Sequence, residues 1–153
     1  MSLVPEWAPN VHPLLVHFPI ALLVTAVVVD VVGWVLRRHL PLRHAATLLY
    51  VLGTGAAVTT YLTGRAASQA VWLPGMAQAV VKEHWDWAFR TVWYFATVTA
   101  VRLVVFRLSR PHPHPAVLAA LMLAGLLGTG LLIETGDQGG RLVYQHGVGT
   151  ARE

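Results

Sequence analysis

The sequence contains no cysteine. Disulfide bonds, thiolate zinc sites, thiolate-ligated iron–sulfur clusters and covalent haem attachment through a C-x-x-C-H motif are therefore excluded. Charged residues are also scarce. They make up 12% of the 153 residues, about half of the roughly 25% that is usual in a soluble domain. No serine–histidine–aspartate pattern, phosphate-binding loop or pair of catalytic carboxylates is recognisable, so hydrolytic and nucleotide chemistry have little support.

Hydrophobic residues take the place of the missing charges and make up 56% of the chain. A span across the roughly 30 Å hydrocarbon core of a bilayer needs about 20 apolar residues. Four stretches meet this requirement, at approximately 13–36, 44–62, 84–108 and 115–133. An outer linker at 65–83 separates the second span from the third. Apolar residues recur in it at helical spacing, so the third helix is expected to begin near Gly75 and to project beyond the membrane.

These spans predict an all-α fold, namely a single four-span membrane domain that covers residues 1–153. The linkers after the first and third spans are short, so the spans that they join run antiparallel. Four antiparallel spans form a four-helix bundle. An even number of crossings places both termini on the same side of the membrane.

The distribution of basic residues predicts the orientation of this bundle, because cytoplasmic loops carry an excess of Lys and Arg. On the side of the first and third linkers Asp30 is the only acid, and the bases there are Arg37, Arg38, Arg43, Arg102, Arg107 and Arg110. The side of the termini carries bases and acids in nearly equal number. The termini are therefore expected outside. The same asymmetry explains the isoelectric point of 10.1 without a nucleic-acid partner.

The eight histidines fall into two groups by the side on which the spans place them. One group is expected to be merely interfacial: His39, His44, His112 and His114. The other lies on the outer side and comes from both ends and the middle of the chain: His12, His17, His84 and His146. Tryptophans at the same level predict an aromatic belt: Trp72, Trp85, Trp87 and Trp93. The outer side is thus the candidate site.

The outer histidines have the properties of haem ligands. Helices that begin on the outer side present their positive ends there, which disfavours imidazolium, and the neutral imidazole is the form that binds metal. Two imidazoles on facing helices can hold a haem iron. We expect His17 and His84 to form the axial pair because both lie on helices. His146 is a further candidate ligand, and His12 is held in reserve.

Two further features fit a haem. Small residues in the second and fourth spans leave room for a flat macrocycle: Gly53, Gly55, Ala56, Ala57, Gly64, Ala124, Gly125, Gly128 and Gly130. Arg65 and Arg90 lie on the same side and are expected to pair with the propionates. A second haem, held by His12 and His146, is the alternative arrangement.

One ion pair is expected inside the membrane. Asp30 lies about seven residues from the cytoplasmic end of the first span, and Arg102 about six from that end of the third, so at 1.5 Å per residue their depths match. An isolated charge at this depth is costly. We therefore predict that the two side chains pair and hold the first and third helices together.

Both ends of the chain carry motifs that resemble a known family. The opening HPLLVHFPIALL contains His12, Pro13, His17, Phe18 and Pro19, and the ending contains LVY-x-HG-x-G at 142–149. With His84 between them, these motifs resemble the bacterial membrane-protein family of domain of unknown function 2231 over nearly the whole chain. Members look like four-helix membrane domains, and some are fused to Rieske-type or cytochrome c-type modules. The resemblance implies redox work in or beside the respiratory chain of the bacterial inner membrane.

The leading hypothesis is a small b-type cytochrome with one or two haems, an electron carrier rather than a stand-alone enzyme. Its expected surroundings are the lipid bilayer and a redox partner protein or quinol, in a homo-oligomer or larger membrane complex if it does not act alone. Two alternatives stay open. Three or four of the imidazoles, with Glu134 or Asp86, would suit zinc, copper or non-haem iron. A cofactor-free structural or assembly subunit would carry the same histidines as ordinary interfacial residues.

Overall fold

The structure is a computed structural model of the 153-residue chain. It describes residues 10–36, 39–71, 73, 75–108 and 113–150, with only the backbone of residues 39 and 40. Within these residues all regular structure is helical, as the sequence predicts. The expectations for His112 and Trp72 lie outside the described residues, and so does that for the His39 side chain.

Five helices follow one another along the described chain: α1 (His12–Leu15), α2 (His17–Val35), α3 (His39–Ala70), α4 (Ala77–Leu108) and α5 (Pro115–Tyr144). The first two form one membrane-length segment, His12–Val35, and the other three each contain another. By length and apolar composition, four helical segments can therefore cross a bilayer, as predicted.

A proline in the first turn of α2 accounts for the break between α1 and α2. Pro19 has no backbone N–H, so it cannot donate to the carbonyl of Leu15 four residues earlier, and its ring crowds that carbonyl. α1 ends at Leu15, and the Thr60 hydroxyl of α3 donates to the Leu15 carbonyl at 3.3 Å. In a regular helix the Leu15 carbonyl would accept from the N–H four residues later. Here it accepts from α3 instead, and this hydrogen bond connects α1 to α3.

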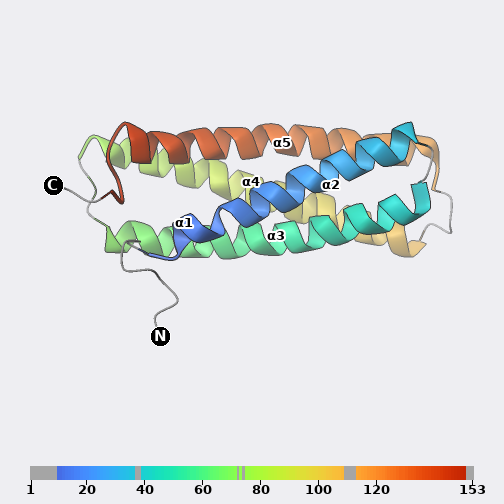
Figure 1. Cartoon of the computed structure of the whole chain (residues 1–153), viewed down its shortest axis with the longest axis horizontal. Coiled ribbons are helices and arrows are strands. Elements are labelled where there is room, and N and C mark those ends of the chain that lie inside the picture. The colour runs from blue at the N-terminus through green and yellow to red at the C-terminus, as the bar shows by residue number, and fades with distance from the viewer. Residues whose placement is uncertain (1–9, 37–38, 72, 74, 109–112, 151–153) are drawn as a thin grey trace.

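The four long helices form a closed ring. α2 contacts α3, α3 contacts α4, α4 contacts α5 and α5 contacts α2, so the diagonals of the ring are α2–α4 and α3–α5. Figure 1 shows α2 crossing obliquely, beginning beside α3 and finishing beside α5. α1 begins and α5 ends at the same end of the bundle (Figure 1), which we call the termini end. The end at which α3 and α5 begin is the opposite end.

Close packing at glycines forms the middle of the bundle. Leu23 of α2 and Phe95 of α4 are completely buried. A methyl group on Gly53 of α3 would lie 2.7 Å from the Leu23 side chain, and one on Gly128 of α5 would lie 2.6 Å from Phe95. Both distances are shorter than van der Waals contact, so these glycines let neighbouring helices approach closely, as small residues do in membrane bundles.

The outer surface of the bundle is apolar. Only 22% to 28% of the most apolar window of each span is buried inside the bundle. Large hydrophobic side chains such as Val35, Leu127 and Ile133 are more than half exposed. Lipid hydrocarbon is the solvent that accepts such a surface, because apolar area of this extent is not left in contact with water.

Two helices extend beyond their predicted spans. α3 continues to Ala70, and α4 begins at Ala77, close to the expected start near Gly75, so the predicted linker at 65–83 is mostly helical. α5 continues to Tyr144, although the prediction ended the span at residue 133. The sequence after residue 135 is rich in glycine, which weakens a helix in water. Packing of the last turns against α4, with Gln138 only 2% exposed, outweighs this weakness.

Candidate functional site

Polar side chains of α1 and α2 approach those of α4 across the diagonal of the ring at both ends of the bundle. At the termini end they are His12 of α1 and His84 of α4. At the opposite end they are Asp30 of α2 and Arg102 of α4. The middle of the same diagonal is filled by the buried side chains of Leu23 and Phe95. The bundle therefore has two polar centres separated by an apolar core.

His12 is held against α3 by a hydroxyl group. Its Nδ1 lies 3.3 Å from Oγ1 of Thr63. The Thr63 hydroxyl can direct its single hydrogen to the carbonyl of Thr59 or Thr60, each at 3.0 Å, and it then accepts from His12. In that tautomer His12 carries its proton on Nδ1, which leaves the lone pair of Nε2 for another partner.

His84 is held against α5 in the same way. Its Nδ1 lies 3.1 Å from the backbone carbonyl of Thr135, and a carbonyl can only accept. The hydroxyl of Thr135 bonds to that of Thr91 at 2.8 Å, which joins α5 to α4 about two turns after His84. His84 is thus also protonated on Nδ1, with Nε2 available.

A glycine lies beside each of these two imidazoles. A methyl group on Gly64 would lie 2.8 Å from Cε1 of His12, and one on Gly139 would lie 3.3 Å from Cε1 of His84. Both glycines lie in parts of α3 and α5 that extend beyond the predicted spans. The elongated helices therefore provide the surfaces against which the two rings pack.

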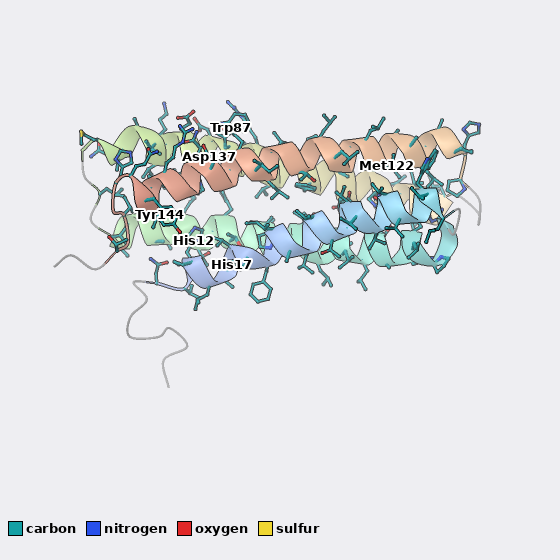
Figure 2. The ribbon with its side chains drawn as sticks, turned by 45° about the horizontal axis from the view of Figure 1, so that its top comes forward. His12, His17, Trp87, Met122, Asp137 and Tyr144 are labelled. Carbon is teal, nitrogen blue, oxygen red and sulfur yellow. The ribbon has the colours of Figure 1, made fainter. Side chains whose placement is uncertain are left out.

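His12 and His84 are the outer histidines that the structure brings together. Both are half-buried, and their side chains are close enough for charges on them to interact. His17 is exposed on the surface of the bundle; Figure 2 labels it one turn after His12. The structure therefore brings His12, which was held in reserve, rather than the exposed His17 towards His84.

The expected propionate partners are also placed differently. Arg65 and Arg90 are exposed, and their guanidinium groups stack on tryptophan rings, at 5.5 Å from the ring centre of Trp85 and 5.1 Å from that of Trp87. These cation–π pairs form part of the aromatic surface at the termini end.

The small residues proposed as haem walls serve other purposes. The space beside Gly125 is filled by the Tyr50 hydroxyl, and the spaces beside Gly53 and Gly128 by Leu23 and Phe95. Gly53, Gly125 and Gly128 therefore let helices touch and leave no slot beside them, whereas a methyl group on Gly55 or Gly130 would have no atom within 4 Å. Beside Gly64 an imidazole occupies the space.

A metal centre built from three or more protein ligands has no counterpart in the described residues. No three His, Asp or Glu side chains gather there as a shared ion would need. Glu134 accepts a hydrogen bond from Gln138 at 3.2 Å, and Asp86 is exposed. Neither is placed with the two histidines as an additional ligand.

The centre at the opposite end is the ion pair that the matched depths predict. Nη1 and Nη2 of Arg102 donate to the two carboxylate oxygens of Asp30 at 2.7 and 2.9 Å. Arg102 is 3% exposed and Asp30 11%. The guanidinium carbon of Arg102 also lies 4.4 Å from the ring centre of Tyr50. This two-point pairing satisfies both charges within the apolar surroundings.

The chain matches the model of one protein family over nearly its whole length. Residues 8–152 fit the predicted membrane protein family of domain of unknown function 2231. The chain belongs to this family. With four membrane-length helices, this member of the 2231 family is a membrane protein. No curated protein and no solved structure matches it.

The opening motif that this member shares with the 2231 family joins two histidines with different surroundings. Five residues separate His12 from His17, and at about 100° per residue this spacing turns the helix by about 140° beyond a full turn. The break before Pro19 adds to the difference by pressing α1 against α3. The motif therefore directs one histidine into the bundle and the other to its surface.

The ending motif of this 2231 family member terminates α5. Gly147 and Gly149 have φ angles of +64° and +76°, in the left-handed region that glycine adopts without strain. The N–H of Gly147 bonds to the carbonyl of Val143 at 3.0 Å, and that of Val148 to the carbonyl of Leu142 at 2.9 Å. The glycines thus close the helix end. His146, the further candidate ligand, lies in this turn, half-buried.

Proposed function

We propose that this protein is a membrane electron carrier that binds a b-type haem between His12 and His84 at the termini end. The observation that carries the proposal is the matched state of the two imidazoles. Nδ1 of each ring bonds to a group on a neighbouring helix, the Thr63 hydroxyl for His12 and the Thr135 carbonyl for His84. With Nδ1 protonated, each ring has its Nε2 lone pair available to a metal.

Histidine ligands of metals have this arrangement as a rule. The ring nitrogen that does not bind the metal donates to a carbonyl, carboxylate or hydroxyl, which orients the ring and selects its tautomer. His12 and His84 have such partners on α3 and α5, two helices that lie on opposite sides of the ring. Ionisable groups inside a membrane bundle are by default candidates for function.

The number of converging side chains favours haem over a bare metal ion. A structural zinc site uses four protein ligands and a catalytic one uses three. Haem iron takes its equatorial ligands from the macrocycle and needs at most two from the protein. Among the described residues, no three His, Asp or Glu side chains gather at one point, so His12 and His84 would be the two protein ligands.

The protein would contribute position and surroundings to this haem. When bound, the haem would supply reversible one-electron transfer. His12 and His84 would hold the iron from α1 and α4. The apolar core at Leu23 and Phe95 would limit the access of water to the haem from the middle of the bundle. Such a carrier would exchange electrons with a membrane quinol or another redox protein.

The proposal includes an orientation. The excess of arginine at the opposite end favours the cytoplasm for that end. The termini end with its two histidines would then lie on the outer side of a bacterial inner membrane. The haem would then exchange electrons with an acceptor outside the cytoplasm. A neighbouring copy or a larger complex would provide the electron donor.

Absorption spectroscopy tests the proposal. The full chain is expressed in cells supplied with haem precursor, purified in detergent and measured before and after dithionite. We expect a Soret band that shifts on reduction, with the sharp visible bands of low-spin iron. His12→Ala and His84→Ala should each lose the low-spin spectrum. His17→Ala, an exposed residue in the same span, should retain it.

Size-exclusion chromatography of each variant serves as the control for folding. A colourless protein that also fails to bind added haemin would overturn the proposal. Such a protein with one equivalent of zinc or copper by elemental analysis would support a metal site instead, and one with neither would support a structural subunit. A spectrum lost in His17→Ala but kept in His12→Ala would reject the assigned ligand pair.

A further inference from the structure

A groove with a volume of about 420 Å³ lies on the outside of the bundle between α4 and α5. Alanines create it: Ala116, Ala120 and Ala124 line it at intervals of four residues, so they share one face of α5. An alanine side chain ends at Cβ, which leaves open the space that a larger residue would fill towards α4. Ala116 and Ala120 are exposed, so the groove faces the surroundings of the bundle.

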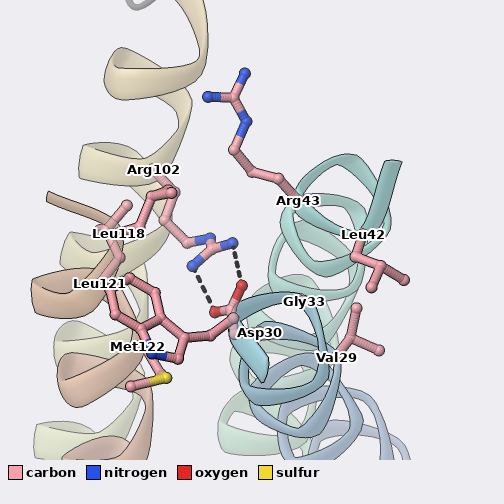
Figure 3. A pocket seen from close by; sticks show the side chains of 10 residues that line it. Val29, Asp30, Gly33, Leu42, Arg43, Arg102, Leu118, Leu121 and Met122 are labelled. Carbon is pink, nitrogen blue, oxygen red and sulfur yellow. Dashed lines mark hydrogen bonds and ion pairs between the residues drawn. The ribbon is translucent and has the colours of Figure 1, made fainter. Parts of the chain in front are cut away.

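The floor of the groove is also a wall of the ion-pair site. Leu121 is 9% exposed and lines both the groove and a small cavity beside Asp30 and Arg102. Figure 3 shows Leu121 on the α5 side of this pair. An occupant of the groove would therefore pack against the residue that separates it from the buried charges.

The wall of the groove suits a hydrocarbon chain. Its lining side chains are apolar except for that of Thr97. The Thr97 hydroxyl donates to the carbonyl of Trp93 at 2.9 Å, so its hydrogen is already used. A sugar, a nucleotide or a quinone ring would find no free side-chain donor along this wall.

The length of the groove matches one leaflet of a bilayer. It begins in the first turn of α5, at the opposite end, and its α5 wall reaches Ala124. Eight residues of helix extend about 12 Å, and half of a hydrocarbon core of roughly 30 Å is about 15 Å. A helix of a second copy, about 10–12 Å thick, would need about 900 Å³ over this length, which is twice the volume of the groove.

The end at which the groove begins is positively charged. The sequence places six arginines at this end or near it, and Asp30 is the one acid among them. Arg107 in the last turn of α4 is exposed, and so is His114, which caps the start of α5. Basic residues at the level of the headgroups attract anionic phospholipids.

We propose that this groove binds one acyl chain of an anionic phospholipid from the leaflet at the opposite end. The chain lies along Ala116, Ala120 and Ala124 and covers Leu121, and the phosphate lies at the level of Arg107. The site is independent of the histidines at the termini end, which the apolar core separates from it.

The test is native mass spectrometry of the full-length protein in a mild detergent. The protein is delipidated and titrated with phosphatidylglycerol or with phosphatidylcholine of the same acyl chains. We expect one phosphatidylglycerol to bind more tightly than any further one, and more tightly than phosphatidylcholine. Ala120→Trp fills the groove and should weaken this first binding by about tenfold or more, which corresponds to about two methylene groups no longer buried. Ala120→Leu, which fills it partly, should have a smaller effect.

Leu126→Trp is the matched control, because Leu126 is an exposed residue of the same helix outside the groove, and it should bind the lipid as the wild type does. Ala120 is exposed, so its variants are expected to fold, and their absorption spectra should equal that of the wild type. Equal binding of phosphatidylglycerol by the wild type and Ala120→Trp would overturn the proposal, as would equal binding of the two lipids by the wild type. A dimer by light scattering that Ala120→Trp dissociates would assign the groove to a second copy and reject the lipid. An isoprenoid quinone extracted from the wild type in place of phospholipid would reject it as well.

Discussion

At the scale of single residues, the burial of a side chain decides what its charge contributes. Arg102 and Asp30 are almost completely enclosed and bind each other through two hydrogen bonds. Arg141 and Asp137 form an ion pair of similar length, 2.8 Å, but about half of each side chain is exposed. The two pairs thus provide a comparison within one molecule between an enclosed and an open ion pair.

Asp30→Asn should destabilise the bundle by about 3–5 kcal/mol, because the guanidinium of Arg102 stays charged and would be left buried without its partner. Asp137→Asn, the matched control, should cost about 0–1 kcal/mol, since water or lipid headgroups replace an exposed partner. The measurement is unfolding of the detergent-purified protein by increasing SDS. Equal costs in the two variants would show that the buried pair does not hold α2 and α4 together.

The histidines show how far single residues could be predicted. Matched depth in the membrane was sufficient to predict the Asp30–Arg102 ion pair, because two side chains at one level can reach each other across a bundle. Depth was insufficient to predict which of His12 and His17 points into the bundle, because that also depends on the rotation of the helix. The five-residue spacing, which leaves His17 about 140° around the helix from His12, is the sequence signal that distinguishes the two residues. Nothing in the sequence showed that α1 would pack on α3.

At the scale of helices, glycines determine how closely the segments approach. Gly125 of α5 contacts the hydroxyl of Tyr50 from the diagonally placed α3, whereas Gly130 has no atom within 4 Å of a methyl group placed on it. Both residues lie in the same helix, so their intrinsic cost to the helix is the same. Only the tertiary environment distinguishes them.

Gly125→Ala should destabilise the protein by about 1–3 kcal/mol, because the new methyl group would overlap the Tyr50 hydroxyl and force a packing shift. Gly130→Ala should be neutral or stabilising by up to about 1 kcal/mol, since alanine favours helix and meets nothing there. SDS unfolding again provides the measurement. Removing the hydroxyl with Tyr50→Phe should restore part of the loss in Gly125→Ala. A failure to restore any of it would show that the overlap is not the cause.

At the scale of the whole molecule, the arrangement of the spans predicts which residues can be reached from each side of a membrane. Met76 lies between α3 and α4 at the termini end, and Thr150 follows α5 at the same end. His114 caps the start of α5 at the opposite end. All three are exposed. The natural chain has no cysteine, so a single introduced thiol can be labelled without background.

Met76→Cys and Thr150→Cys should react with a membrane-impermeant maleimide in intact bacterial cells, and His114→Cys should react only after the membrane is opened. The reason is the excess of arginine at the opposite end, which is retained in the cytoplasm. Mass spectrometry of the purified protein measures the labelling. Labelling of His114→Cys alone would reverse the proposed orientation. Different results for Met76→Cys and Thr150→Cys would contradict the arrangement of four spans.

Hydrophobic runs and the placement of charge determined much of this protein without coordinates. Scarce charge, four apolar segments and short linkers were enough for an all-helical membrane bundle, because a chain in hydrocarbon must satisfy its backbone within each helix. The end motifs were enough for the family. The tertiary structure decided which histidine faces His84, how far α3 and α5 extend, and where the arginines lie. These features depend on the rotation of each helix and on its packing against neighbours far away in the sequence, which hydropathy and spacing do not contain.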